Sequence, residues 1–281
     1  MNGRGGLRGA IARYRGRDIE LKTRRQLEAM REAGALVAAT LAAVTERAEP
    51  GVSTAELDAL AERTIRAGGG VPSFLGYHGF PGSICASVNE QIVHGIPSPE
   101  QVLADGDLLS VDCGAILDGW HGDSAVTIAV GDVPPADLAL SAACRAAMEA
   151  GVRAVQPGAR LTDVSYAIQE ACRAAATADR ADYGIVADYG GHGIGTSMHM
   201  DPFLPNHGEP GRGPRLRPGM ALAVEPMLVA GDPDAVELDD GWTVVTASGG
   251  RAVHWEHTVA VTDDGPWLLT APAGAPDRPG V

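Results

Sequence analysis

Two aspartates on one predicted β-hairpin are the residues best suited to chemistry in this chain of 281 residues. Asp112 and Asp123 flank Asp118-Gly119, a dipeptide that accepts the positive φ values of a type I′ turn, and apolar residues alternate on both sides of it. With that turn at the centre, residue 112 lies opposite residue 125 and diagonal to residue 123, so the two β-carbons are about 7 Å apart. Carboxylates this close repel each other, and they must share a proton or hold cations.

Three later segments each add one residue of a metal-ligating type. They are His192 in GGHGIG, Glu225 in AVEPM and Glu256 in HWEHT. Any one of the five is more typical of an ordinary strand-end carboxylate or a core histidine, but the five together indicate a metal site. Four carboxylates and one imidazole suit a pair of divalent ions such as Mn, Fe or Co, with Zn compatible, and suit a thiolate-bound structural zinc poorly.

The elements that must position these residues follow a repeated order. Helical periodicity and capping patterns predict helices over about 23–48, 53–67, 136–155 and 163–176. A Pro-Gly dipeptide separates the two helices of each pair, and β segments with the proposed ligands follow each pair. This order predicts one α/β (α+β) domain with a mainly antiparallel sheet, outer helices and two halves related by approximate two-fold symmetry.

Composition narrows the setting of the protein. With 45% hydrophobic residues, the chain can bury a sizeable core in one large domain or two medium ones. No segment has the ~20 apolar residues of a membrane span, and the first residues lack the apolar core of a signal peptide, so we expect a cytoplasmic protein. The four cysteines show no CxxC spacing and are expected to be reduced thiols.

Charge is divided unevenly along the chain. Residues 1–31 carry nine basic and three acidic side chains, whereas the whole chain has a net charge of −14. The basic segment could contact RNA or another phosphate-rich surface, although a solvated tail is the more ordinary interpretation. Nothing else in the sequence indicates nucleic-acid binding.

Five motifs together resemble the type I methionine aminopeptidases over about residues 19–262. They are GYHGFPGSICASVNEQIVHGIP, VDCGAILDGWHGDSA, GGHGIGTSMHMDP, ALAVEPM and HWEHTVAVT. The resemblance implies the pita-bread fold and removal of the initiator methionine from nascent proteins, by attack of a water that bridges two divalent metal ions. We then expect a basic flexible arm over 1–18, the pita-bread catalytic domain over 19–265 and a C-terminal tail over 266–281.

The same resemblance implies a role for each site residue. The ligands of a dinuclear site would be Asp112, Asp123, His192, Glu225 and Glu256, with Asp123 and Glu256 bridging both ions. Glu225 is the candidate general base, and His94 and His199 would contact the substrate backbone and the reacting amide. The methionine pocket would be lined by Tyr77, Phe80, Cys85, Met198 and Trp242, and Phe74 could narrow it. For His78, His121, His207, His254 and His257 we expect surface or structural roles.

Two alternatives remain at this stage. A prolidase or Xaa-Pro aminopeptidase of the same fold would use a similar metal set, but such relatives usually carry a substantial N-terminal domain, whereas we expect only about twenty residues of this sequence to precede the fold. A non-catalytic binding protein on the same fold is the other alternative, against which the complete ligand set argues. We also expect a monomer, and the basic arm could contact the ribosome.

Overall fold

The computed structural model describes residues 19–272 and 274, and the predicted basic arm over 1–18 lies outside the described residues. The α-helices are α1 (Arg24–Arg47), α2 (Thr54–Ala67), α3 (Pro135–Ala154) and α4 (Leu161–Asp179). Helices α1 and α2 each begin at a capping box, in which Thr23 pairs with Gln26 and Ser53 pairs with Glu56. All four helices predicted from the sequence are confirmed, with small shifts at their ends.

The strands are short apart from the two that form the central hairpin. They are β1 (Val71–Pro72), β2 (Ile84–Val88), β3 (Gln91–Val93), β4 (Asp107–Leu117), β5 (Trp120–Val130), β6 (Tyr183–Ile185), β7 (Gly190–Gly193), β8 (Met200–Pro205), β9 (Ala221–Val224), β10 (Met227–Ala230), β11 (Ala235–Glu237), β12 (Val244–Thr246), β13 (Ala252–His254), β14 (His257–Thr262) and β15 (Gly265–Leu268). A 3₁₀ turn, η2 (Tyr77–Gly79), lies between β1 and β2.

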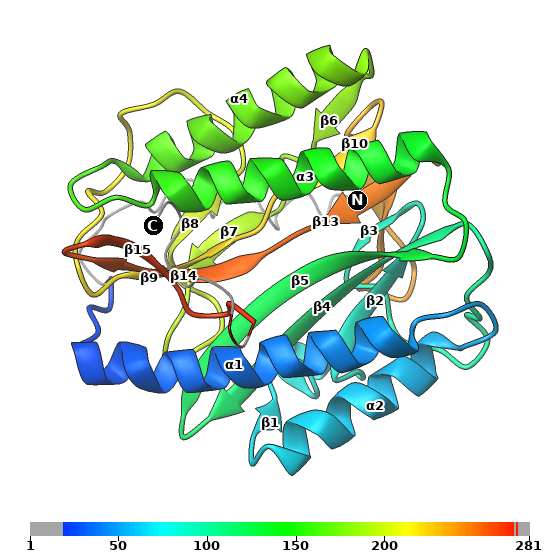
Figure 1. Cartoon of the computed structure of the whole chain (residues 1–281), viewed down its shortest axis with the longest axis horizontal. Helices are drawn as coiled ribbons and strands as arrows, with labels where there is room; N and C mark the ends of the chain where they lie inside the picture. The colour runs from blue at the N-terminus through cyan, green and yellow to red at the C-terminus, as the bar shows by residue number, and fades with distance from the viewer. Residues whose placement is uncertain (1–18, 273, 275–281) are drawn as a thin grey trace, which may run out of the picture.

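The paired strands of the described chain all run antiparallel. One sheet has the order β1-β4-β2 with β5 beside β4, and the largest has the order β15-β14-β9-β7-β8. Two smaller sheets have the orders β13-β10-β6 and β11-β12-β3. In Figure 1, α1 and α2 lie in the lower part of the view and α3 and α4 in the upper part, with most of the strands between the two pairs, so the predicted antiparallel fold with outer helices is confirmed.

Each half has its own apolar core. Buried side chains join α1 and α2 to β2, β4 and β5, and a second cluster joins α3 and α4 to β8, β9, β10 and β14. Helix α1 approaches the rest of the fold very closely at Gly34, where a β-carbon would lie 2.0 Å from the Leu269 carbonyl oxygen. Gly122 of β5 faces the same point of the helix. This close packing fixes β5, the strand that carries Asp123.

The C-terminal segment differs from the sequence-based expectation. The predicted tail over 266–281 begins too early, because β15 pairs with β14 and Leu269, Thr270 and Ala271 are buried. Within residues 19–272 and 274, no helix is long and apolar enough to cross a membrane.

Candidate active site

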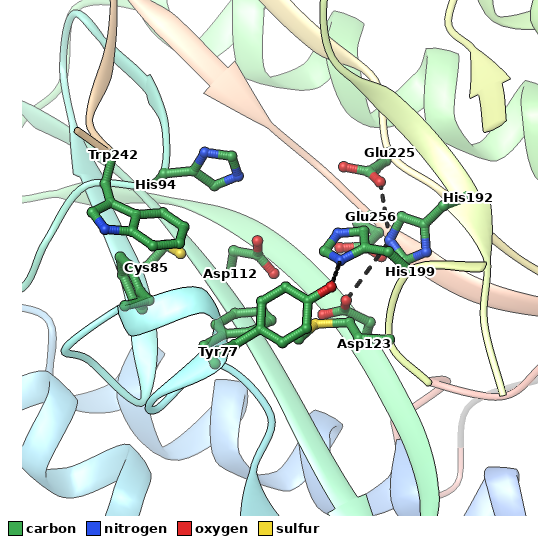
Figure 2. Close-up of a pocket in the computed structure, with 13 residues that line it drawn as sticks. Tyr77, Cys85, His94, Asp112, Asp123, His192, His199, Glu225, Trp242 and Glu256 are labelled. Atoms are coloured by element: carbon green, nitrogen blue, oxygen red, sulfur yellow. Dashed lines mark hydrogen bonds and ion pairs between the residues drawn. The ribbon is translucent and has the colours of Figure 1, made fainter. Parts of the chain in front are cut away.

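The predicted site residues all line one cavity of about 150 Å³ between the two halves (Figure 2). They come from both halves of the chain and are His94, Tyr77, Phe80, Cys85, Asp112, Asp123, His192, Met198, His199, Glu225, Trp242 and Glu256. Phe74 is a further lining residue. The structure therefore brings together residues that are up to 182 positions apart in the sequence, from Phe74 to Glu256. Their individual roles remain predictions.

The hairpin formed by β4 and β5 has the register expected from its turn. Asp118 and Gly119 both adopt positive φ angles, 50° and 83°. Asp112 lies opposite Ala125, and Asp123 lies opposite Gly114, so the two carboxylates are diagonal neighbours on one face. The local turn chemistry thus aims both groups into the cavity.

Backbone pairing between the halves brings Glu256 beside Asp123. The Glu256 N–H donates to the Ala125 carbonyl at 3.0 Å, and the Ser124 hydroxyl donates to the Glu256 carbonyl at 2.6 Å. One residue pair further on, the Thr258 hydroxyl donates to the Asp123 carbonyl at 2.7 Å. Since all these groups are buried, the strand that carries Asp123 and the segment that carries Glu256 are fixed relative to each other.

Glu225 and His192 lie at irregular points of the second half. Glu225 lies between β9 and β10, directly before Pro226. Since β9 pairs with β14 and β10 pairs with β13, this interruption lies opposite the one between β13 and β14, which contains Glu256. His192 lies at a register shift of β7, between Gly191 and Gly193. A β-carbon on either glycine would come within 2.2 Å of a neighbouring carbonyl oxygen, so only glycine allows the imidazole to be presented at this point.

The hydrogen bonds of His192 leave one ring nitrogen for a ligand. Its Nδ1 lies 3.0 Å from the Gly193 carbonyl, to which an Nδ1–H can donate. Its Nε2 then carries a lone pair and lies 3.4 Å from Glu225 Oε1 and 4.0 Å from Asp123 Oδ2. One ligating atom from each of Asp123, His192 and Glu256 lies within 4.8 Å of the other two.

The electrostatics of this group disfavour four ionised carboxylates. Burial raises the pKa of Asp112 to about 7. Burial, followed by the charges of the neighbouring acids, raises the pKa values of Asp123, Glu225 and Glu256 well above those of ordinary carboxyl groups. Burial also lowers the pKa of His192 to about 3, which keeps the imidazole neutral.

The donor set fits divalent cations. Asp112 Oδ1, Asp123 Oδ1 and Glu256 Oε1 are buried and have no hydrogen-bond partner among the described residues. Buried oxygens of this kind are stabilised by a cation, and a neutral imidazole with a free Nε2 completes an oxygen-rich ligand set. Cations would also remove the repulsion that raises the carboxyl pKa values.

The other end of the cavity is apolar and contains sulfur. Phe74, Phe80, Cys85 and Met198 form a buried cluster, against which Trp242 packs. The rings of Phe80 and Trp242 meet edge to face with centroids 5.1 Å apart. Such a pocket suits a flexible, polarisable apolar side chain.

Two further histidines, His94 and His199, line the cavity together with the apolar pocket and the carboxylates. His199 is held by Tyr77, whose hydroxyl lies 2.9 Å from its Nδ1. His94 meets Trp242 edge to face, with centroids 6.3 Å apart, and burial lowers the pKa of His94 to about 4. Figure 2 shows both imidazoles directed into the cavity, where they could contact a bound peptide.

Comparison with known proteins identifies the family. Residues 28–263 match the model of metallopeptidase family M24. The chain belongs to metallopeptidase family M24. It is 59% identical to methionine aminopeptidase 1 of Mycobacterium tuberculosis, over 92% of this chain and 98% of that protein. A methionine aminopeptidase from Thermotoga maritima is 40% identical, with a TM-score of 0.86 over 90% of this chain and 99% of that structure.

This M24 chain also resembles more distant members in fold alone. The prolidase from Pyrococcus furiosus is 21% identical, with a TM-score of 0.70, and the match covers 89% of this chain but 65% of that structure. The resemblance to methionine aminopeptidases and the pita-bread fold expected from the sequence are therefore confirmed.

One histidine of this M24 site was missed by the sequence analysis. His254 is 1% exposed, and its Nε2 lies 3.7 Å from Glu225 Oε2, on the side of that carboxylate away from His192. Its position two residues before Glu256 could have placed it on the same face of an extended segment. The Nδ1 atoms of His121 and His257, for which surface or structural roles are expected, lie 3.0 and 2.8 Å from the hydroxyls of Ser73 and Thr270.

Proposed function

We propose that this chain removes the N-terminal methionine of nascent polypeptides, with two divalent metal ions held by Asp112, Asp123, His192, Glu225 and Glu256. The observation that carries the proposal is that the carboxylate-rich group and the sulfur-containing apolar pocket line the same cavity. The first suits cations and a substrate α-amine, and the second suits a thioether side chain. The 59% identity to a methionine aminopeptidase supports the same substrate.

The side chains of the cavity would divide the work of hydrolysis. When bound, the metal ions would supply Lewis acidity and lower the pKa of water. The free α-amine of the substrate would bind at the metal site near Asp112, which would restrict cleavage to N-terminal residues. Glu225 would accept the proton of the attacking water, and His199, oriented by Tyr77, would donate to the oxygen that gains charge at the scissile carbonyl. His94 would steady the substrate backbone.

Peptide hydrolysis tests this proposal directly. Metal-stripped protein is assayed with Met-Ala-Ser, Met-Leu-Ser and an Ala-Pro peptide, before and after addition of Mn or Co. Metal-dependent release of methionine from Met-Ala-Ser, with little from Met-Leu-Ser, is the expected result. Cleavage of the Ala-Pro peptide alone would favour a prolidase or Xaa-Pro aminopeptidase, and bound metal without any cleavage would favour a non-catalytic binding protein.

The cofactor needs its own measurement. The ligand set accepts Co, Mn, Fe or Zn, so we propose two ions per chain and expect metal analysis of the loaded protein to approach a ratio of two. A ratio that stays at one with full activity would contradict the dinuclear proposal.

The setting proposed for the protein follows from its substrate. We propose that it acts as a monomer in the cytoplasm, where nascent chains emerge, and that the basic arm contacts the ribosome. Deletion of residues 1–17 is expected to reduce co-sedimentation with ribosomes, and unchanged co-sedimentation would remove that contact. Light scattering of the full chain tests whether it is a monomer in solution.

A further inference from the structure

A second cavity of about 470 Å³ adjoins the first. The two cavities share five lining residues, His94, Asp112, His192, His199 and Glu225. The other walls include apolar side chains of β3, β8 and β10 together with Tyr189. A peptide whose first side chain fills the apolar pocket has its scissile bond near the shared residues. The residues that follow in the peptide would therefore extend through this second cavity toward the solvent.

The outer wall of this second cavity is acidic. Asp188, in the loop between β6 and β7, and Asp201, on β8, line it and are exposed. Neither forms an ion pair with another residue in the described part of the chain, and no described lysine or arginine lines the cavity. Burial raises the pKa of Tyr189, and the charges of Glu237 and Asp188 raise it further.

A buried polar atom at the inner end of the same cavity makes no hydrogen bond within the described part of the chain, although it lies 3.7 Å from Glu225 Oε2. His254 lines the cavity, and its Nε2 makes no hydrogen bond to the described residues. The backbone N–H of His254 donates to the hydroxyls of Ser110 and Thr127, at 3.2 and 3.0 Å, so the residue is held in place. An unsatisfied buried nitrogen indicates a ligand that supplies the missing contact, and a peptide carbonyl can accept from an Nε2–H.

We propose that this second cavity binds the substrate residues that follow the second one, and that Asp188 and Asp201 favour peptides with a basic side chain at the third or fourth position. The inference rests on the proposed peptidase function. A lysine or arginine there would pair with two carboxylates that have no competing cation, whereas a glutamate would be repelled. Because both aspartates are exposed, the preference is expected to be modest and weakened by salt.

Competition between charged substrates measures this preference. The metal-loaded full chain is assayed with Met-Ala-Lys-Ser and Met-Ala-Ser-Lys, with the two glutamate counterparts, and with Met-Ala-Ser-Ser as the neutral reference. We expect kcat/KM for the preferred lysine peptide to exceed that of its glutamate counterpart by about 10-fold at low ionic strength, and by less in 0.5 M salt.

Two double variants separate a local effect from net charge. Asp188→Asn/Asp201→Asn is expected to bring the lysine-to-glutamate ratio close to one while hydrolysis of the neutral peptide is retained. Glu46→Gln/Asp263→Asn makes the same change in net charge at exposed sites that do not line the cavity, and it should keep the parent ratio. Equal ratios in the two double variants, or no lysine preference in the parent, would overturn the inference alone. Absence of methionine release from every peptide would overturn the proposed function together with it.

Discussion

Removal of the metal should make the stability of this protein depend on pH in an unusual direction. Asp112 has a pKa of about 7 in the folded chain, and those of Asp123, Glu225 and Glu256 are raised well above the ordinary value. In the unfolded chain these groups ionise near pH 4. Between the unfolded and folded pKa values the folded state binds more protons, so its free energy of unfolding falls as pH rises.

Between pH 7 and pH 8, the contribution of the buried carboxyl groups to the free energy of unfolding outweighs that of the histidines. Each proton that the folded chain retains across one pH unit lowers the free energy of unfolding by about 1.4 kcal/mol. If the cluster retains one such proton, the free energy of unfolding falls by about 1.4 kcal/mol between pH 7 and pH 8, and three retained protons lower it by about 4 kcal/mol. The buried histidines act in the opposite direction, because their pKa values are lowered, as in His192 and His254. Above pH 7 that contribution is only about 0.2 kcal/mol for each histidine.

Urea unfolding at pH 7.0, 7.5 and 8.0 measures the dependence, in EDTA and in saturating Mn. The metal-free protein is expected to lose between about 1.4 and 4 kcal/mol over this interval, and the loaded protein should show no such loss, because the ions stabilise the ionised carboxylates. Asp112→Asn serves as a matched control, since it should stabilise the metal-free protein at pH 8 while reducing the gain from Mn. A metal-free stability that is constant or rises with pH would refute the reasoning.

Two further predictions concern positioning and packing. His199→Ala should lower kcat by about 10²–10³-fold with metal content unchanged. Tyr77→Phe removes the 2.9 Å contact to His199 and should lower kcat by about 5-fold. Loss of metal in either variant would contradict these roles. Gly34→Ala should destabilise the fold by about 2 kcal/mol or more, because its β-carbon would collide with Leu269. Ala42→Gly, at an exposed position of the same helix, should cost about 1 kcal/mol in urea unfolding, and a stabilised Gly34→Ala variant would contradict the packing.

Local sequence signals were sufficient for the central hairpin and the helices. Asp118-Gly119 fixes the turn, the turn fixes the register, and the register places Asp112 diagonal to Asp123. The helices could be predicted because apolar spacing, capping boxes and Pro-Gly breaks act over a few residues. The motifs around the remaining ligands were recognisable through the family resemblance, which the comparisons confirm.

Other parts of the structure left little local signal. His254 looked like a structural histidine until the pairing of β10 with β13 placed it beside Glu225. Strand β15 was predicted as part of a tail, because its burial depends on β14 and on contact of the following residues with α1. The sequence of a four-residue strand does not indicate which segments it pairs with.

The sequence by itself determined which residue types are available for metal binding, which of them share a hairpin, and where the helices begin and end, since each depends on interactions between near neighbours in the chain. Only the tertiary structure decided that Asp123 and Glu256 lie side by side and that the apolar pocket, the carboxylates and the acidic second cavity are continuous. These arrangements depend on hydrogen bonds and packing between segments more than 100 residues apart, such as Thr258 with Asp123.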